Sequence, residues 1–246
     1  MYRSLGVYVN KKTWIIFAVV VTGLMVALVV WSRNSTPQVD VSSIDTNAIQ
    51  QASPASGNIG DHVFGKADSK VILIEYGDFQ CPGCKAAQPG ISTISSQYTD
   101  TVAFVFRNFP LTTIHANARA AAAAVEAAGL EGKYWEMHDA VYQNQANWEN
   151  LTGDDRTNRF IDIATSVGLS SNTFKADLAK DSINKKISFD QAIGLKLNVN
   201  STPSFYLGGK LIDTSVIQDV QQGTGDKLRD ILDSAVTAAG MTPPSR

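Results

Sequence analysis

The stretch VILIEYGDFQCPGC, residues 71–84, carries the features that decide the fold of this 246-residue chain. An apolar, β-branched run at residues 71–74 is followed by Cys81 and Cys84, which are the only two cysteines. A lone pair of thiols two residues apart is either half of a metal site or a dithiol that cycles between reduced and oxidised forms. Zinc needs four ligands and the three histidines lack ligand spacing, so we favour the redox dithiol.

The sequence around the cysteines predicts an α/β domain. Residues 71–76 are typical of a strand buried on both faces, residues 82–98 of a helix, and residues 102–107 of a second strand. The order strand, helix, strand implies a parallel crossover. Strand signals return at residues 204–207 and 210–212, which are joined by a two-residue Gly-Gly turn.

Between these strands the chain changes character. Residues 113–197 show helical patterns and no strand signal, and a last helix is expected at residues 226–239. We therefore expect one domain at residues 62–246, an α/β sheet split by a helical insertion at about 113–197.

An uncharged apolar segment, residues 14–31, precedes this domain. As a helix it would span about 27 Å, close to the roughly 30 Å hydrocarbon core of a bilayer. Positive charges before it outnumber those that follow closely, which predicts residues 1–13 in the cytoplasm and the domain outside. A cleaved signal peptide is the alternative, but the run exceeds the usual apolar region of about 7–15 residues. We favour an uncleaved, single-pass signal anchor in the cell membrane.

Residues 32–61 lack aromatic side chains and are rich in small polar residues, so we expect a flexible linker. The net charge of −2 gives no reason to expect a nucleic acid partner. An extracytoplasmic dithiol would lie where disulfides form and persist.

Cys81 and Cys84 are expected to open the helix at residue 82. The unsatisfied N–H groups and the dipole at a helix N-terminus favour a thiolate, which makes Cys81 the attacking nucleophile. Pro82 suits the first helical turn, where its missing N–H costs nothing. Cys84 lies one turn further on, so its sulfur can reach back to Cys81 and resolve a mixed disulfide.

Glu75 stands six residues before Cys81 in an otherwise apolar strand. A buried carboxylate is costly, and a role that would justify it is carrying protons to and from Cys84. The alternative is a partly exposed glutamate at the end of a strand, paired with a cation. Arg107 is a conceivable partner, although it could equally be a surface charge or paired elsewhere.

Thr202-Pro203 directly precedes the returning strand, and a proline that enters a strand from a turn is a common place for a cis peptide bond. If the bond is cis, the backbone of Thr202 becomes a free edge that faces the dithiol. Such an edge can pair with an extended substrate chain.

Other candidates are expected to be structural. His115 is a core or capping residue, with a place near the active face as the alternative. Five residues at helical spacing are expected in the core rather than around a cofactor: Tyr134, Trp135, Met137, His138 and Tyr142.

Taken together, these features resemble the thioredoxin superfamily, and more closely its DsbA-like thiol-disulfide oxidoreductases. The resemblance covers essentially all of residues 62–240, including the helical insertion. The matching segments are EYGDFQCPGCKAAQP (75–89), FRNFPL (106–111), HANARAAAAAVEAA (115–128), GKYWEMHDAVYQNQ (132–145) and STPSFYLGGK (201–210).

The resemblance implies a thioredoxin-like fold and a specific set of roles. Cys81 would be the surface nucleophile, Cys84 the buried resolving thiol, Pro203 the cis-proline and Glu75 the buried carboxylate below them. Three residues are expected to contact the substrate: Thr202, Pro82 and Gly83.

The resemblance also implies an enzyme that introduces disulfide bonds into exported proteins with cysteine thiols. It would use no cofactor and no metal, and a quinone-linked membrane partner would accept the electrons. The Pro-Gly dipeptide lacks the histidine of the most oxidising members, which predicts a milder oxidant. A disulfide reductase or isomerase is the alternative, and a chaperone-like peptide-binding module is a further one.

Overall fold

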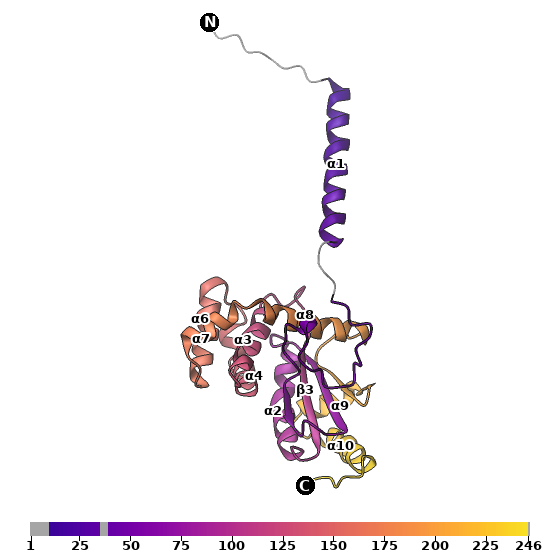
Figure 1. Cartoon of the computed structure of the whole chain (residues 1–246), viewed down its shortest axis with the longest axis vertical. Helices are drawn as coiled ribbons and strands as arrows, with labels where there is room; N and C mark the ends of the chain where they lie inside the picture. Colours follow the sequence, from indigo (N-terminus) through magenta and orange to yellow (C-terminus); the bar gives the residue numbers. More distant parts are fainter. Residues whose placement is uncertain (1–9, 35–38, 246) are drawn as a thin grey trace. The chain divides into compact units, whose positions relative to one another are not determined.

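The computed structural model describes residues 10–34 and 39–245 (Figure 1). Its elements are α1 (Lys11–Asn34), η1 (Pro54–Ser56), β1 (Val63–Gly65), β2 (Val71–Gly77), α2 (Pro82–Gln97), β3 (Val102–Asn108), α3 (Ala118–Leu130), α4 (Tyr134–Gln143), α5 (Gln145–Trp148), α6 (Gly153–Ser166), α7 (Ser171–Leu178), α8 (Asp181–Lys196), β4 (Ser204–Leu207), β5 (Lys210–Leu211), α9 (Thr214–Gln221) and α10 (Asp226–Ala238). The chain divides into two compact units, Met1–Gln38 and Val39–Arg246.

The first unit contains α1, which extends beyond the expected residues 14–31 at both ends. Its segment Lys11–Leu28 is long and apolar enough to cross a membrane, and none of this segment is buried within the structure. A signal sequence would meet the same criteria, so length and composition leave both readings of this helix open. Most of the expected cytoplasmic segment 1–13 lies outside the described residues.

The second unit is built on a mixed five-stranded sheet in the order β1-β3-β2-β4-β5. β2 and β3 are parallel, as the strand–helix–strand order predicted, and β4 pairs antiparallel with both β2 and β5. The Gly208-Gly209 turn joins β4 to β5 as expected, with positive φ at both glycines. The sequence missed the short edge strand β1 and the helix α9, which is capped by Asp213.

Alternation along β2 sends its side chains to two different cores. Val71 and Leu73 pack with residues of α2, α9 and α10. Ile74 and Tyr76 point to the opposite face, where residues of α8 cover the sheet. The period of two therefore puts Glu75 on the α2 face, the same face as the cysteines.

The helical insertion forms a third core, made mainly by α3, α4, α6 and α7, which gather together in Figure 1. Cys81, Cys84 and Phe79 belong to this core, so the insertion packs directly against the start of α2. Four of the five residues expected in the core are buried, and Trp135 packs against them.

The N-terminal strap, defined here as residues 39–61, differs from the expected flexible linker. Its apolar residues Val39, Val41, Ile44 and Ile49 pack on the core below the sheet. Lys196 at the end of α8 donates hydrogen bonds to three strap carbonyls. Sparse isoleucines and valines in a polar background therefore help to fix the strap, because the domain supplies the apolar surface on which they lie.

A buried ionic cluster holds the end of the strap. Arg107 is fully buried, and its guanidinium binds Asp61 at 2.8 Å and donates to the carbonyls of Thr46 and Ala48 at 2.7 Å each. Lys186 binds the other oxygen of Asp61 at 2.9 Å and Asp190 at 2.6 Å. Arg107 thus pairs with the strap, and Glu75 is not its partner.

Candidate active site

The two cysteines lie where β2 ends and α2 begins. Cys81 is the residue that precedes the first helical turn, and Pro82 occupies that turn. Cys84 is almost completely buried, and Cys81 retains 8% exposure. Both thiols are free in this structure. The loop therefore presents one reachable sulfur and hides the other one turn behind it.

The sulfur of Cys81 faces the loop that precedes β4. The Thr202-Pro203 peptide bond is cis, and the carbonyl oxygen of Thr202 lies 3.3 Å from Cys81 Sγ. In the thiol form the S–H donates to this carbonyl. The Thr202 hydroxyl is buried and has no other partner among the described residues, so it can turn to donate to a thiolate.

Burial and hydrogen bonding set the pKa values of the two thiols apart. The Cys84 thiol donates to the Cys81 sulfur and lowers the pKa of Cys81 to about 5, although burial opposes the shift. The Thr202 hydroxyl and the backbone N–H groups of Cys84 and Gly83 lower it further. Burial raises the pKa of Cys84 well above its ordinary value. At neutral pH the pair therefore holds one thiolate at Cys81 and one proton at Cys84.

A groove runs beside Cys81 between the loop at residues 198–204 and α9. Gly83, Thr202 and Pro203 line it, and a Cβ added at Gly83 would lie 3.4 Å from Pro203 Cδ. Pro82 is exposed next to them. The residues expected to contact the substrate thus lie together around the reachable sulfur.

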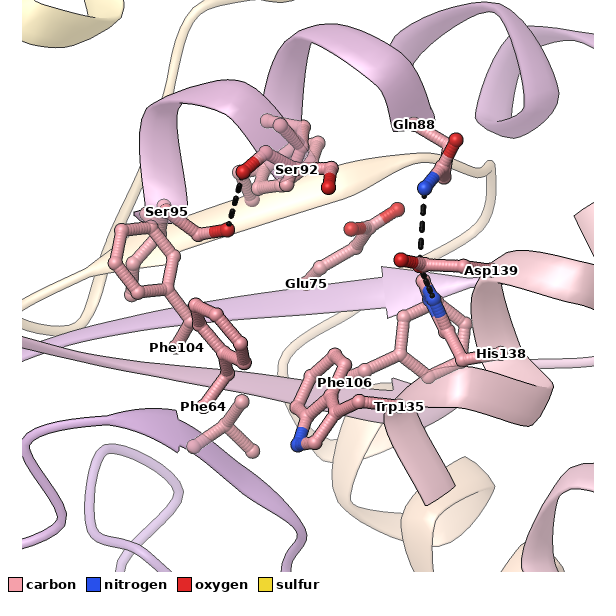
Figure 2. A pocket seen from close by; sticks show the side chains of 14 residues that line it. Phe64, Glu75, Gln88, Ser92, Ser95, Phe104, Phe106, Trp135, His138 and Asp139 are labelled. Atoms are coloured by element: carbon pink, nitrogen blue, oxygen red, sulfur yellow. Dashed lines mark hydrogen bonds and ion pairs between the residues drawn. The ribbon is translucent and has the colours of Figure 1, made fainter. Parts of the chain in front are cut away.

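Glu75 lines a separate pocket below α2 (Figure 2). Glu75 is half-buried, and its carboxyl lies near Gln88 of α2 and the pair His138–Asp139 of α4. Aromatic side chains make up much of the rest of the pocket lining. No hydrogen bond or ion pair of Glu75 is present in the described part of the chain, so the expected alternative of a cation partner is not found there. Burial raises the pKa of Glu75 to about 8, and the charge on Cys81 adds to this shift.

Asp78 is a residue of the site that the sequence analysis missed. Its buried carboxylate accepts hydrogen bonds from the backbone N–H groups of Gln80 and Leu111 and binds His115 Nδ1 at 2.8 Å. Its carbonyl accepts from the N–H of Cys81. An aspartate at the first position of a turn is a recognisable signal, because its side chain accepts from the backbone N–H two residues on. Here the same carboxylate also holds His115 close to the active-site loop.

Gln145 also supports this loop. Its side-chain amide donates to the carbonyl of Phe79 at 2.8 Å and to that of Cys81 at 3.4 Å. Because Gln145 is buried and belongs to α5, the insertion helps to fix the backbone that carries the nucleophile.

The arrangement supplies a stabilised thiolate, a buried thiol and a carboxyl group that holds a proton near neutral pH. In residues 10–34 and 39–245 there is no group of three or more His, Cys, Asp or Glu side chains that could hold a metal ion. A stabilised thiolate beside a buried thiol is the arrangement that performs thiol–disulfide exchange.

A family model described as Thioredoxin matches residues 57–224. The Na(+)/H(+) antiporter NhaA 1 of Salinispora arenicola (strain CNS-205) is 34% identical over 150 residues, which are 61% of this chain and 22% of that protein. The chain thus spans about a fifth of the length of the curated relatives it matches. The match covers only a minor part of the antiporter, so the antiporter's activity is not assigned to this chain.

Solved structures share the fold. BdbD from Bacillus subtilis is 24% identical, with a TM-score of 0.60, and the match covers 78% of this chain and 100% of that one. A thioredoxin-like oxidoreductase from Silicibacter pomeroyi DSS-3 is 25% identical, with a TM-score of 0.53. This match covers 72% of this chain and 96% of that one. The expected thioredoxin-like α/β fold is confirmed.

Proposed function

The chain belongs to the thioredoxin family and has the fold of DsbA-like proteins, and from this we propose that it is a membrane-anchored, extracytoplasmic enzyme that introduces disulfide bonds into exported proteins. The observation that carries the proposal is the contrast between a reachable Cys81 with a lowered pKa and a buried Cys84 with a raised one.

The reaction begins with the Cys81–Cys84 disulfide. A substrate thiolate attacks Cys81, the Cys81–Cys84 bond breaks, and a mixed disulfide forms while Cys84 leaves as a thiolate that takes up a proton. A second substrate thiolate then attacks the substrate sulfur of the mixed disulfide and releases Cys81 as a thiolate. Two electrons pass from the substrate to the enzyme, and an acceptor must remove them; a quinone-linked membrane protein would fit this role.

The thiolate environment favours oxidation over reduction of substrates. A reduced form that is stabilised by a low thiol pKa gives up its electrons less readily, so its disulfide is a stronger oxidant. The absence of a histidine at Gly83 moderates this effect. A reductase would need a potential closer to that of thioredoxin.

The direction can be tested by equilibrating the full chain, purified in detergent, with glutathione buffers. We expect a reduction potential between about −120 and −180 mV, and a value near about −270 mV would contradict the oxidase and support a reductase. Because reduction at neutral pH adds one proton for two electrons, the potential should fall by about 30 mV per pH unit above pH 5. Below pH 5 Cys81 is also protonated, and the slope should steepen to about 59 mV per unit.

We further propose that Glu75 supplies the proton that Cys84 takes up. Replacing it, Glu75→Gln, should slow formation of the mixed disulfide at pH 7 by about tenfold, a small effect for a general acid because the pocket also admits water. The difference should shrink and then disappear as the pH rises and the wild-type carboxyl ionises, because burial raises the pKa of Glu75 in the disulfide form as well, where Cys81 carries no charge. Stopped-flow measurements of exchange with a model thiol would show both effects.

Glu149→Gln is a suitable control, because this glutamate lies outside the Glu75 pocket. Misfolding would not explain slower exchange in Glu75→Gln. The raised pKa means that the folded state must keep a proton on Glu75 above its ordinary pKa, so the variant should be more stable than the wild type at pH 7. Equal exchange rates for wild type and Glu75→Gln would rule out the proton role.

A further inference from the structure

Gln221 connects α9 to the dipeptide between the two cysteines. It is the last residue of α9, and its side-chain Nε2 donates a hydrogen bond to the carbonyl oxygen of Gly83 at 2.9 Å. The two residues are 138 positions apart in the sequence. Gln221 is partly buried and lines the groove beside Cys81.

The position of Gln221 is fixed by the packing of α9 on α2. Val216, Ile217 and Val220 are buried in the core shared with α2. Gly90 of α2 permits the close approach, because a Cβ at this residue would lie only 2.7 Å from Val220 Cγ1. The side chain that follows Val220 is therefore held at a constant distance from the start of α2.

The carbonyl that Gln221 binds belongs to the Gly83–Cys84 peptide, whose N–H lies at the opposite end. This N–H is one of the donors to the Cys81 sulfur. A hydrogen bond to the carbonyl of a peptide polarises that peptide and strengthens the bond made by its N–H, by about 10–30% in condensed-phase estimates. Gln221 can therefore act on Cys81 through a single peptide plane without touching the sulfur.

We infer, on the basis of the exchange reaction proposed above, that Gln221 is a positioning residue whose amide holds and polarises the Gly83–Cys84 peptide and so stabilises the Cys81 thiolate. The ionisable groups that face Cys81 are Cys84, Glu75 and Tyr142, and the negative charge of the Cys81 thiolate raises the pKa of each of them. These groups keep their protons near neutral pH, so the stabilisation that Gln221 gives to the thiolate comes from its neutral amide dipole.

The test is Gln221→Met, which keeps the length of the side chain and removes the N–H donor. Thiolate absorbance against pH should show the pKa of Cys81 raised by about half a unit, a threefold change in the thiol–thiolate equilibrium. The reduction potential of the full chain should become about 15 mV more negative, which is that threefold change at 29.6 mV per tenfold. Gln221→Lys keeps an N–H donor and should leave the pKa at or below the wild-type value.

Gln218→Met provides the matched control. Gln218 lies one turn earlier on α9, lines the same groove and is exposed. No hydrogen bond of its side chain occurs in the described ranges, so its replacement should change neither the pKa nor the potential. A Gln221→Met variant that matches Gln218→Met in both measurements would overturn the inference, as would a raised pKa in Gln221→Lys.

These outcomes are distinct from failure of the proposed function. A wild-type chain that titrates with a low Cys81 pKa but exchanges no disulfides would contradict the function alone. A wild-type chain that exchanges disulfides while Gln221→Met leaves the thiolate unchanged would contradict only the role of Gln221.

Discussion

Replacing the reachable sulfur with oxygen, Cys81→Ser, should reduce disulfide formation in a reduced two-cysteine protein by at least about 10³-fold. The serine hydroxyl is not ionised at neutral pH and cannot form a mixed disulfide, so no step of the proposed exchange remains. The substitution removes no buried volume of consequence, and the fold should persist. The measurement is the amount of disulfide formed in the substrate, which is read from the substrate's mass after its remaining free thiols have been alkylated.

The Cys84→Ser variant distinguishes the roles of the two sulfurs. This variant keeps the nucleophile and loses the resolving thiol, so mixed disulfides between Cys81 and substrates should accumulate and be visible on non-reducing gels. Cys81→Ser should form none. Undiminished disulfide formation by Cys81→Ser would contradict the redox role. A wild type that forms no disulfides, while both proteins are fully active in a peptide-binding or anti-aggregation assay, would support the chaperone-like alternative.

The second large effect concerns stability. Asp61→Asn should lower the free energy of unfolding by about 3 kcal/mol, because it leaves the fully buried guanidinium of Arg107 without its carboxylate. Burial opposes ionisation of Asp61, but the charges of Lys186 and Arg107 hold the pKa of Asp61 below its ordinary value. The ionised carboxylate therefore stabilises the fold at neutral pH, and this contribution is lost as the pH falls through the lowered pKa.

Chemical denaturation of the full chain would measure this loss. Asp68→Asn is the matched control, because Asp68 is 84% exposed and its ion pair with Lys66 lies on the surface. Surface pairs contribute about 0–1 kcal/mol. Equal effects of the two substitutions would show that the strap is not anchored by its buried charge.

The sequence was sufficient to predict the parts of the fold that depend on local patterns. The buried strand before Cys81, the crossover helix and the Gly-Gly hairpin all follow from runs of a few residues. The fold class followed as well, because these patterns occur in a single order. The structure also places Cys81 opposite the cis Thr202-Pro203 bond, with Cys84 buried behind it, in agreement with that prediction.

The parts that escaped prediction depend on partners far away in the chain. Asp61 resembles any polar linker residue until it meets Arg107 and Lys186, which are 46 and 125 positions away. Gln221 is one of several glutamines near the C-terminus, and only the packing of α9 on α2 brings it to Gly83. Pairwise contacts of this kind leave no periodic signal in a single sequence.

The buried ionic cluster that holds the strap also affects the order in which parts of the chain fold. The strap is synthesised before every element of the domain, yet Asp61 can complete its ion pairs only after β3 and α8 exist. Such long-range contacts form late, because the entropy of closing the intervening loop must be overcome first. The strap contains no aromatic residue, so it can remain solvated and undocked without aggregating. Its docking would then close the domain as the last event of maturation, after the sheet and α8 are already in place.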